Sequence, residues 1–207
     1  YFEWSQIIIF LSIASMFLGA IAAIKQTNIK RLLAYSSIGH IGYVLIGLAS
    51  NNDEGVKGAI IYMFIYVVMN IAIFTILLSI KLNDRYIEKI KDLSGLSKVK
   101  PLSGIIISMI MLSMAGIPPL AGFFGKFYIF VAALEAQLTY LAVLGVLASV
   151  ISAFYYLRII KVIYFDQEKE RFDTNFNFGV KFTLAFSTIL ILLYFINPNI
   201  INQFILN

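Results

Sequence analysis

The sequence contains no cysteine and only one histidine among its 207 residues. The lack of cysteine excludes disulfide bridges, iron–sulfur clusters and thiolate metal sites, and a single histidine cannot build a histidine-based metal site. The sequence also lacks a phosphate-binding loop, a dinucleotide-binding glycine motif and a serine–histidine–aspartate set. We therefore expect no metal, no bound cofactor and no redox active site on this chain.

Charged residues are scarce, at 13%, whereas hydrophobic residues make up 60% of the sequence. The mean hydropathy is +0.89, far above that of soluble globular proteins. The few charges lie between long apolar runs, a separation that a soluble helical bundle would not show. The net charge of +5 is not arranged as a basic patch interleaved with aromatic residues. These features predict a polytopic membrane protein in a lipid bilayer, with no nucleic-acid partner.

A membrane-spanning helix needs about 20 apolar residues, and the apolar runs predict six spans in one all-α transmembrane domain covering residues 1–207. The expected helices are at about residues 5–24, 30–50, 57–80, 101–134, 139–165 and 179–197. The fourth is too long for one straight helix across roughly 30 Å of hydrocarbon. Gly116, Pro118 and Pro119 interrupt it, and proline removes helix hydrogen bonds, so the fourth helix should be broken at residues 116–119.

The connections between the spans alternate in charge. The first four carry net charges of +3, −1, +3 and −1, and the fifth has five basic against four acidic residues. Basic residues gather on the cytoplasmic or matrix side of membrane proteins. Connections one, three and five should therefore lie on that side, with both termini on the intermembrane-space or periplasmic side.

Lys126 is the only formal charge deep inside an apolar run. It lies nine residues before Glu135, or about 13 Å from the helix end at 1.5 Å per residue. Intramembrane charges usually mark ion pathways, so one interpretation is a lysine that takes up and releases protons along a hydrated path. The other is a permanently charged lysine paired with carbonyl groups of the broken helix. Broken helices mark ion sites in transporters, although a plain proline kink is also common.

Polar residues recur every three or four positions on three other helices, so that each set shares one helix face. On the second helix the set includes His40 and Tyr43, and His40 suits proton relay because its pKa is ordinarily near neutral. The fifth helix carries Ser149 and Ser152. Each set is also explained by hydrogen bonds between packed helices. The remaining members are Ser36, Gly47, Tyr62, Tyr66, Asn70, Gly145 and Tyr156.

Two stretches resemble signatures of the antiporter-like subunits of respiratory complex I. Residues 26–43 read QTNIKRLLAYSSIGHIGY, and residues 112–128 read LSMAGIPPLAGFFGKFY. The GKFY form looks most like the subunit N family, called subunit 2 in mitochondria. The six expected spans match the C-terminal portion of that family, namely the second five-helix repeat plus one closing helix.

The resemblance implies a proton-translocating subunit of the membrane arm of NADH:ubiquinone oxidoreductase. It implies that Lys126 is a proton carrier and His40 a residue of a polar axis, and we expect Tyr43, Ser149 and Ser152 to line the same path. Lys30 is expected to anchor the topology first and to receive protons second. FMN, Fe–S clusters, NADH and ubiquinone are expected on other subunits of the complex, which are the expected partners.

This chain departs from the family pattern because it lacks the glutamate and lysines of the first repeat. The resemblance therefore implies a split subunit, whose N-terminal half comes from a separate chain. The phenylalanine-, isoleucine- and asparagine-rich composition suits an AT-rich mitochondrial genome, so we expect the mitochondrial inner membrane, with a bacterial plasma membrane as the alternative. Other functions left open are a cation/proton antiporter or membrane-bound hydrogenase subunit, or a structural scaffold that does not pump.

Overall fold

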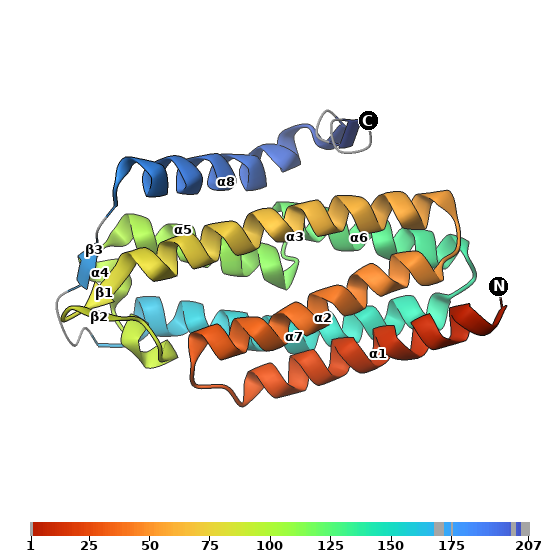
Figure 1. The fold of residues 1–207 in the computed structure, drawn as a ribbon, viewed down its shortest axis with the longest axis horizontal. Helices are drawn as coiled ribbons and strands as arrows, with labels where there is room; N and C mark the ends of the chain where they lie inside the picture. Colours follow the sequence, from red (N-terminus) through yellow and green to blue (C-terminus); the bar gives the residue numbers. More distant parts are fainter. Residues whose placement is uncertain (1, 168–171, 175, 200–201, 204–207) are drawn as a thin grey trace.

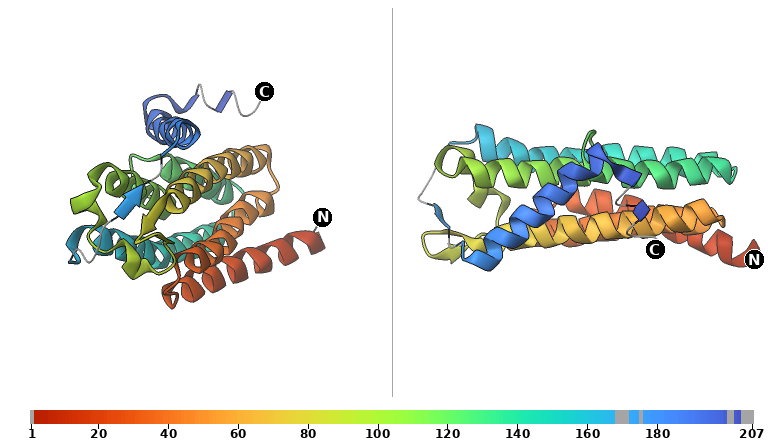
Figure 2. Two further views of the ribbon diagram at one scale, coloured as in Figure 1. Left: turned by 60° about the vertical axis from the view of Figure 1, so that its left-hand side comes forward. Right: turned by 90° about the horizontal axis from the view of Figure 1, so that it is seen from above.

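The computed structural model describes residues 2–167, 172–174, 176–199 and 202–203 as a bundle of long helices with a small sheet at one end (Figure 1). The helices are α1 (Phe2–Ile24), α2 (Ile29–Ala49), α3 (Asp53–Ser79), α4 (Leu96–Val99), α5 (Pro101–Ala115), α6 (Ala121–Glu135), α7 (Thr139–Phe165) and α8 (Phe178–Ile196). A short 3-10 helix covers Ile90–Leu93. Helix α8 lies on the outside of the bundle (Figure 2). It packs mainly against α3.

Four helices among the described residues, α1, α2, α3 and α7, are long and apolar enough to cross a membrane. Helices α5 and α8 are apolar but shorter. The expected break in the fourth span is present, since α5 ends at Ala115 and α6 begins at Ala121. The protein is therefore a mostly helical membrane protein with one discontinuous helix, while the expected number of six spans stays a prediction.

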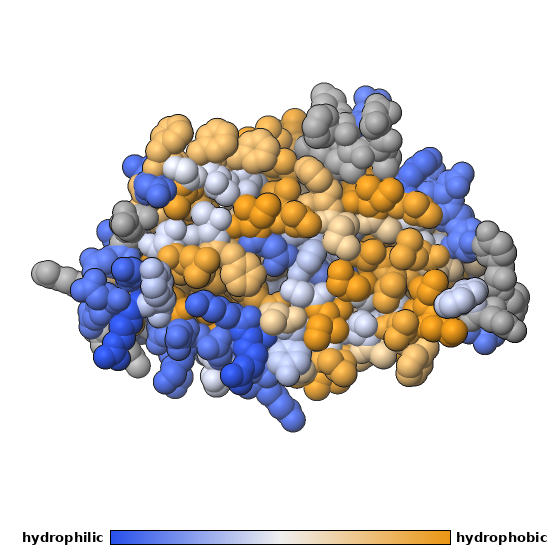
Figure 3. All heavy atoms as spheres, viewed as in Figure 1, coloured by the Kyte–Doolittle hydropathy of each residue, from blue (hydrophilic) through white to orange (hydrophobic). Residues whose placement is uncertain are grey.

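The connections with basic residues meet at one end of the bundle. The turns from α1 to α2, from α3 to α5 and from α7 to α8 all lie there (Figure 1). Hydrophilic side chains gather at this end, and apolar side chains cover the middle of the same face (Figure 3). Helix α1 begins at the opposite end (Figure 1). This arrangement matches the alternating charge of the connections.

A three-stranded antiparallel sheet, in the order β2–β1–β3, ties these connections together. Strands β1 (Ile80–Leu82) and β2 (Arg85–Tyr86) follow α3, and β3 (Phe172–Thr174) precedes α8. Backbone bonds from Ile29 N to Glu88 O (2.8 Å) and from Ile90 N to Thr27 O (2.9 Å) attach the first connection to the third. The hydropathy pattern indicated only polar loops here, because strands this short have no recognisable period.

Helices α1 and α2 approach closely because small residues line their contact. A Cβ added to Gly19 would lie 2.5 Å from the Gly39 nitrogen and 2.7 Å from the Tyr35 carbonyl oxygen. The Ser12 hydroxyl donates a hydrogen bond of 2.7 Å to the Gly42 carbonyl oxygen. Van der Waals contact between backbones drives helix association in lipid, where the hydrophobic effect between helices is absent.

We predict that Gly19→Ala lowers the free energy of unfolding by about 1–3 kcal/mol, because its methyl group must push the backbone of α2 away. Gly39→Ala is the matched control, since its Cβ would meet its nearest neighbour, the Met16 carbonyl oxygen, at an ordinary 3.8 Å. Thermal unfolding in detergent measures both. Equal melting temperatures for the two variants would contradict the close packing of α1 on α2.

Candidate functional site

Lys126 lies in the second turn of α6, just after the helix break, and its side chain is only 4% exposed. Its Nζ donates hydrogen bonds to the carbonyl oxygens of Met114 (3.2 Å) and Ala115 (3.0 Å) and to the hydroxyl of Ser149 (2.8 Å). A protonated lysine has three N–H donors and no acceptor. The three acceptors around Nζ therefore match the ammonium form of Lys126.

The two prolines explain why these carbonyls are available. In a continuous helix the carbonyls of Met114 and Ala115 would accept the backbone N–H groups four residues later, at positions 118 and 119. Both positions are proline, which has no N–H. The Lys126 amine supplies the two donors that the prolines lack, and so it satisfies carbonyls that would otherwise be unpaired at membrane depth.

Gly116 makes room for the lysine and turns the chain at the break. Its φ is +86°, a left-handed conformation that only glycine adopts without strain, and its N–H bonds the carbonyls of Leu112 and Ser113. A Cβ at this position would lie 3.0 Å from Cδ and 3.2 Å from Nζ of Lys126. The carboxyl end of α5 also carries the negative end of its helix dipole, which favours a nearby cation.

Ser149 on α7 connects the lysine to the rest of the bundle. Its hydroxyl accepts from Lys126 and donates to the Ala115 carbonyl oxygen at 3.2 Å. The Tyr43 ring from α2 lies under Nζ of Lys126, 4.7 Å from its centroid, as in a cation–π contact. The Tyr43 hydroxyl is buried near Ser149 and Ser152 but bonds neither of them, nor any other described residue, with hydrogen-bond geometry.

His40 is the centre of a second polar cluster, which we call the histidine cluster and define as Ser36, His40, Tyr62 and Tyr156. The Nδ1 of His40 hydrogen-bonds the Tyr62 hydroxyl at 2.6 Å, and its Nε2 bonds the Tyr156 hydroxyl at 2.9 Å. Tyr156 in turn hydrogen-bonds Ser36. All four residues are buried, so α2, α3 and α7 each contribute to one closed network.

The structure brings together most, but not all, of the site residues expected from the sequence. Lys126, Ser149, Tyr43 and His40 follow one another through the bundle, since the Tyr43 ring also lies 6.2 Å from the imidazole. Ser152 is buried, but its hydroxyl bonds the Ala148 carbonyl oxygen of its own helix at 2.9 Å.

Lys30 is half-buried at the start of α2. It precedes His40 by ten residues, which is about 15 Å along the helix. Lys30 therefore does not reach His40 directly, although Ser36 of the histidine cluster is only six residues, about 9 Å, farther along the same helix.

The sequence pattern favoured Tyr62 and Tyr156 as hydrogen-bonding contacts between helices, and both make such contacts, with His40 as the shared partner. Their spacing of four from other polar residues was the available signal, but it does not say which helix they face. The sequence pattern indicated that carbonyls of the broken helix could pair with the lysine, but it did not identify them as those of Met114 and Ala115. Counting four residues back from each proline would have found both.

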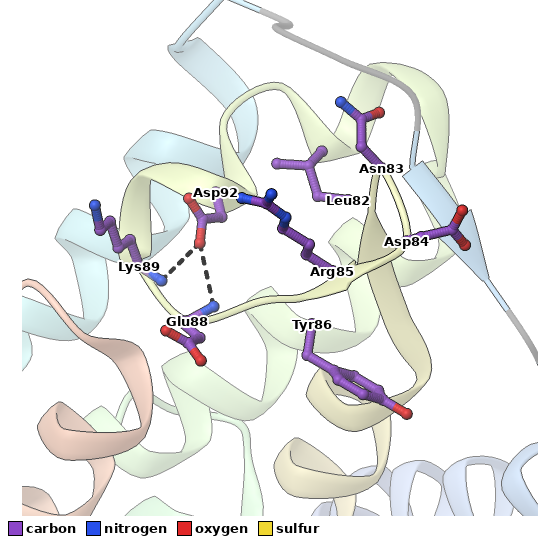
Figure 4. Close-up of a pocket in the computed structure, with 8 residues that line it drawn as sticks. All are labelled: Leu82, Asn83, Asp84, Arg85, Tyr86, Glu88, Lys89 and Asp92. Carbon is purple, nitrogen blue, oxygen red and sulfur yellow. Dashed lines mark hydrogen bonds between the residues drawn. The ribbon is translucent and has the colours of Figure 1, made fainter.

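A separate polar pocket lies at the basic end, lined by residues of β1, β2 and the turn that follows (Figure 4). The Asp92 carboxylate there accepts hydrogen bonds from the backbone N–H groups of Glu88 (3.1 Å) and Lys89 (2.7 Å). The pocket shares no lining residue with either polar cluster. Among the described residues, no group of three or more histidines and carboxylates could hold a metal ion.

Comparison with known proteins places these features in a family. Residues 1–152 match the model of the family described as NADH:quinone oxidoreductase/Mrp antiporter, transmembrane. The NADH-quinone oxidoreductase subunit N of Pelagibacter ubique is 60% identical over 197 residues, covering 95% of this chain and 42% of the relative. The chain thus corresponds to the C-terminal half of subunit N and spans less than half of the relative's length.

Solved structures agree with this assignment. A chain of respiratory complex I from Thermus thermophilus, solved with bound aureothin, superimposes with a TM-score of 0.84 at 30% identity, covering 96% of this chain and 45% of that one. A chain of the Mrp complex from Dietzia sp. has a TM-score of 0.82 at 19% identity, covering 98% of this chain and 46% of that one, which shows the shared fold alone. The broken helix with its buried lysine, the matching family model and the similarity to subunit N agree: this chain belongs to the NADH:quinone oxidoreductase/Mrp antiporter transmembrane family.

Proposed function

We propose that this chain translocates protons as part of subunit N of a proton-pumping NADH:quinone oxidoreductase, with Lys126 as the proton carrier. The observation that carries the proposal is the position of Lys126, buried at a helix break with two backbone carbonyls and one hydroxyl around its amine. Charge is costly in the membrane, and intramembrane lysines that face the bundle interior commonly mark proton pathways. The similarity to subunit N supports the same function.

Ser149 is the residue through which Lys126 exchanges protons with the rest of the path in this proposal. Its hydroxyl accepts one N–H of Lys126 and donates its own hydrogen to the Ala115 carbonyl oxygen, which cannot pass a proton on. Transfer therefore requires the Ser149 hydroxyl to rotate away from Ala115, toward water or the Tyr43 hydroxyl. The hydroxyl then takes a proton on one side as it gives up its own on the other, so Lys126 gains or loses a proton through Ser149 and the serine stays neutral.

The histidine cluster forms the other part of the path. Ser36 lies one turn closer than His40 to the basic end of the bundle, so Ser36, Tyr156 and His40 lead from that end toward Lys126. Lys30 stays a candidate entry residue at the start of α2, and Ser152 a candidate to hold water beside Tyr43. Since no hydrogen bond joins the two polar clusters among the described residues, we place a file of water between His40 and Ser149.

We further propose that the redox chemistry takes place on other subunits, which bind NADH, FMN, the Fe–S clusters and ubiquinone. Helices α1 and α7 are the least covered of the four long helices, and both present large apolar side chains outward, among them Phe10 and Phe154. These faces suit other membrane-arm helices, including the N-terminal half of subunit N. That this half comes from a separate chain stays a prediction.

The basic end of the bundle is proposed to face the cytoplasm or the mitochondrial matrix, by the positive-inside rule. Both termini would then face the periplasm or the intermembrane space. The relative from Pelagibacter ubique is bacterial, which supports a plasma membrane, whereas the composition of the chain suggested the mitochondrial inner membrane. The family also includes Mrp antiporters, but the 60% identity to a subunit N favours the oxidoreductase subunit over an antiporter or membrane-bound hydrogenase subunit.

We predict that Lys126→Met lowers NADH-driven proton translocation by about tenfold or more, because methionine fills the site but carries no proton. Proton uptake by membrane vesicles that contain the assembled complex measures this. Lys57→Met is the control, since Lys57 is exposed and forms a surface ion pair with Glu54 at 2.8 Å. Unchanged pumping by a normally assembled Lys126→Met variant would contradict the proposal and favour a structural scaffold that does not itself pump.

Tyr156→Phe should lower the free energy of unfolding by about 1–3 kcal/mol, because it leaves polar atoms of His40 and Ser36 without their partner. Tyr43→Phe is the matched control, since the Tyr43 hydroxyl bonds no described residue. Thermal unfolding in detergent compares the two variants. A Tyr156→Phe protein as stable as Tyr43→Phe would contradict the closed histidine cluster.

The origin of the N-terminal half is decided by the mass of the intact polypeptide. If the N-terminal half is a separate chain, the mature polypeptide should have a mass close to the 23.3 kDa of this sequence. It should copurify with a second chain that carries the first repeat. Intact-protein mass spectrometry of the purified complex measures both. A single polypeptide of about twice that mass would show that the two halves are continuous.

A further inference from the structure

Helices α5 and α8 enclose a groove that the proton path does not use. Its volume is about 630 Å³, within the range of about 300–1,000 Å³ for small-molecule sites. Most of its lining is aliphatic, from one face of each helix. Several of these side chains are exposed to the outside of the bundle, including Leu102 (70%), Ile105 (55%) and Ile189 (53%). The groove therefore opens toward the hydrocarbon of the membrane.

One end of the groove carries positive charge. Lys100 precedes the first residue of α5 and Lys181 lies in the first turns of α8, and both line the groove. No acidic residue lines it in the part of the chain that the structure describes. Both helices also begin at this end (Figure 1), so their positive dipole ends add to the two lysines.

The length of the groove matches one leaflet of a bilayer. Along α8 its lining runs from Lys181 to Leu192, eleven residues or roughly 16 Å. Half of a hydrocarbon core of roughly 30 Å is about 15 Å. The lysines then lie at the depth of the lipid headgroups, and the aliphatic lining at the depth of the acyl chains.

We propose that the α5–α8 groove is a binding site for an anionic phospholipid, with the phosphate held between Lys100 and Lys181 and an acyl chain along the groove. Charge complementarity selects this occupant, because basic pockets between transmembrane helices on the positively charged side bind anionic headgroups. An apolar helix of another protein would fill the lower groove but leave both lysines without an anion. The lipid joins α8 to α5, which otherwise contact each other little.

A photoactivatable phosphatidylglycerol, with its reactive group in the acyl chain, tests the site in the assembled complex. The complex is placed in phosphatidylcholine nanodiscs with a small fraction of the probe and irradiated, and the labelled peptides are mapped by mass spectrometry. We expect labelling of α5 and α8 lining residues such as Ile105 and Ile189, above that given by a phosphatidylcholine probe of the same chain length.

The double variant Lys100→Gln/Lys181→Gln should lower this enrichment by about tenfold, given the attraction that each lysine near the surface contributes. Lys25→Gln/Lys161→Gln is the matched control. It removes the same charge from exposed lysines at the same end, outside the groove, and should keep the enrichment. An equal loss of enrichment in both double variants would mean that general surface charge attracts the probe, and it would contradict the proposed site.

A second pair of variants tests the groove and leaves the charges in place. Ala185→Phe fills the groove from α8, whereas Gly179→Phe adds a comparable ring at an exposed position of the same helix outside the lining. Only Ala185→Phe should reduce labelling. Equal labelling by the two lipid probes in the unmodified complex, or crosslinks from the groove to another protein chain, would contradict the proposal.

Discussion

The core of this protein depends on one set of hydrogen bonds. The buried amine of Lys126 donates to two backbone carbonyls that have no N–H donor from their own helix. A carbonyl without a donor costs several kcal/mol in hydrocarbon, and a charged lysine there is also costly. The carbonyls of Met114 and Ala115 and the amine of Lys126 satisfy each other. The break in the helix and the lysine therefore depend on each other, and neither is favourable alone at this depth.

The surrounding helices hold this pairing and connect it to a second one. Ser149 adds the third acceptor of Lys126 from α7, and the histidine cluster ties α2, α3 and α7 together around His40. Both networks are internally paired, which makes them well ordered. The Tyr43 ring lies between them with its hydroxyl unpaired among the described residues. In the proposed relay, a proton would pass between the two networks only when water or a side-chain rotation joins them, and that step would gate the relay.

The two faces of the chain have different neighbours in the proposed assembly. The outward faces of α1 and α7 suit the protein helices of a membrane arm, since the chain covers less than half of its subunit N relative. The groove between α5 and α8 suits lipid, because its two lysines need an anion. The small sheet joins the third and fifth connections, and backbone hydrogen bonds join the first connection to the third. Together they hold the basic end of the bundle in place.

The membrane environment, the apolar runs, the position of the break and the polar faces of the helices could all be predicted from the sequence. Each depends on composition, on helix periodicity or on the chemistry of proline and glycine, which act over a few residues. The amino-acid sequence also singled out Lys126, because a charge inside an apolar run is conspicuous wherever it lies in the fold. Only the tertiary structure decided what these groups contact. Lys126 bonds carbonyls 11 and 12 residues away, and His40 bonds a tyrosine 116 residues away. Periodicity says which face of a helix is polar, but the packing of helices decides which faces meet.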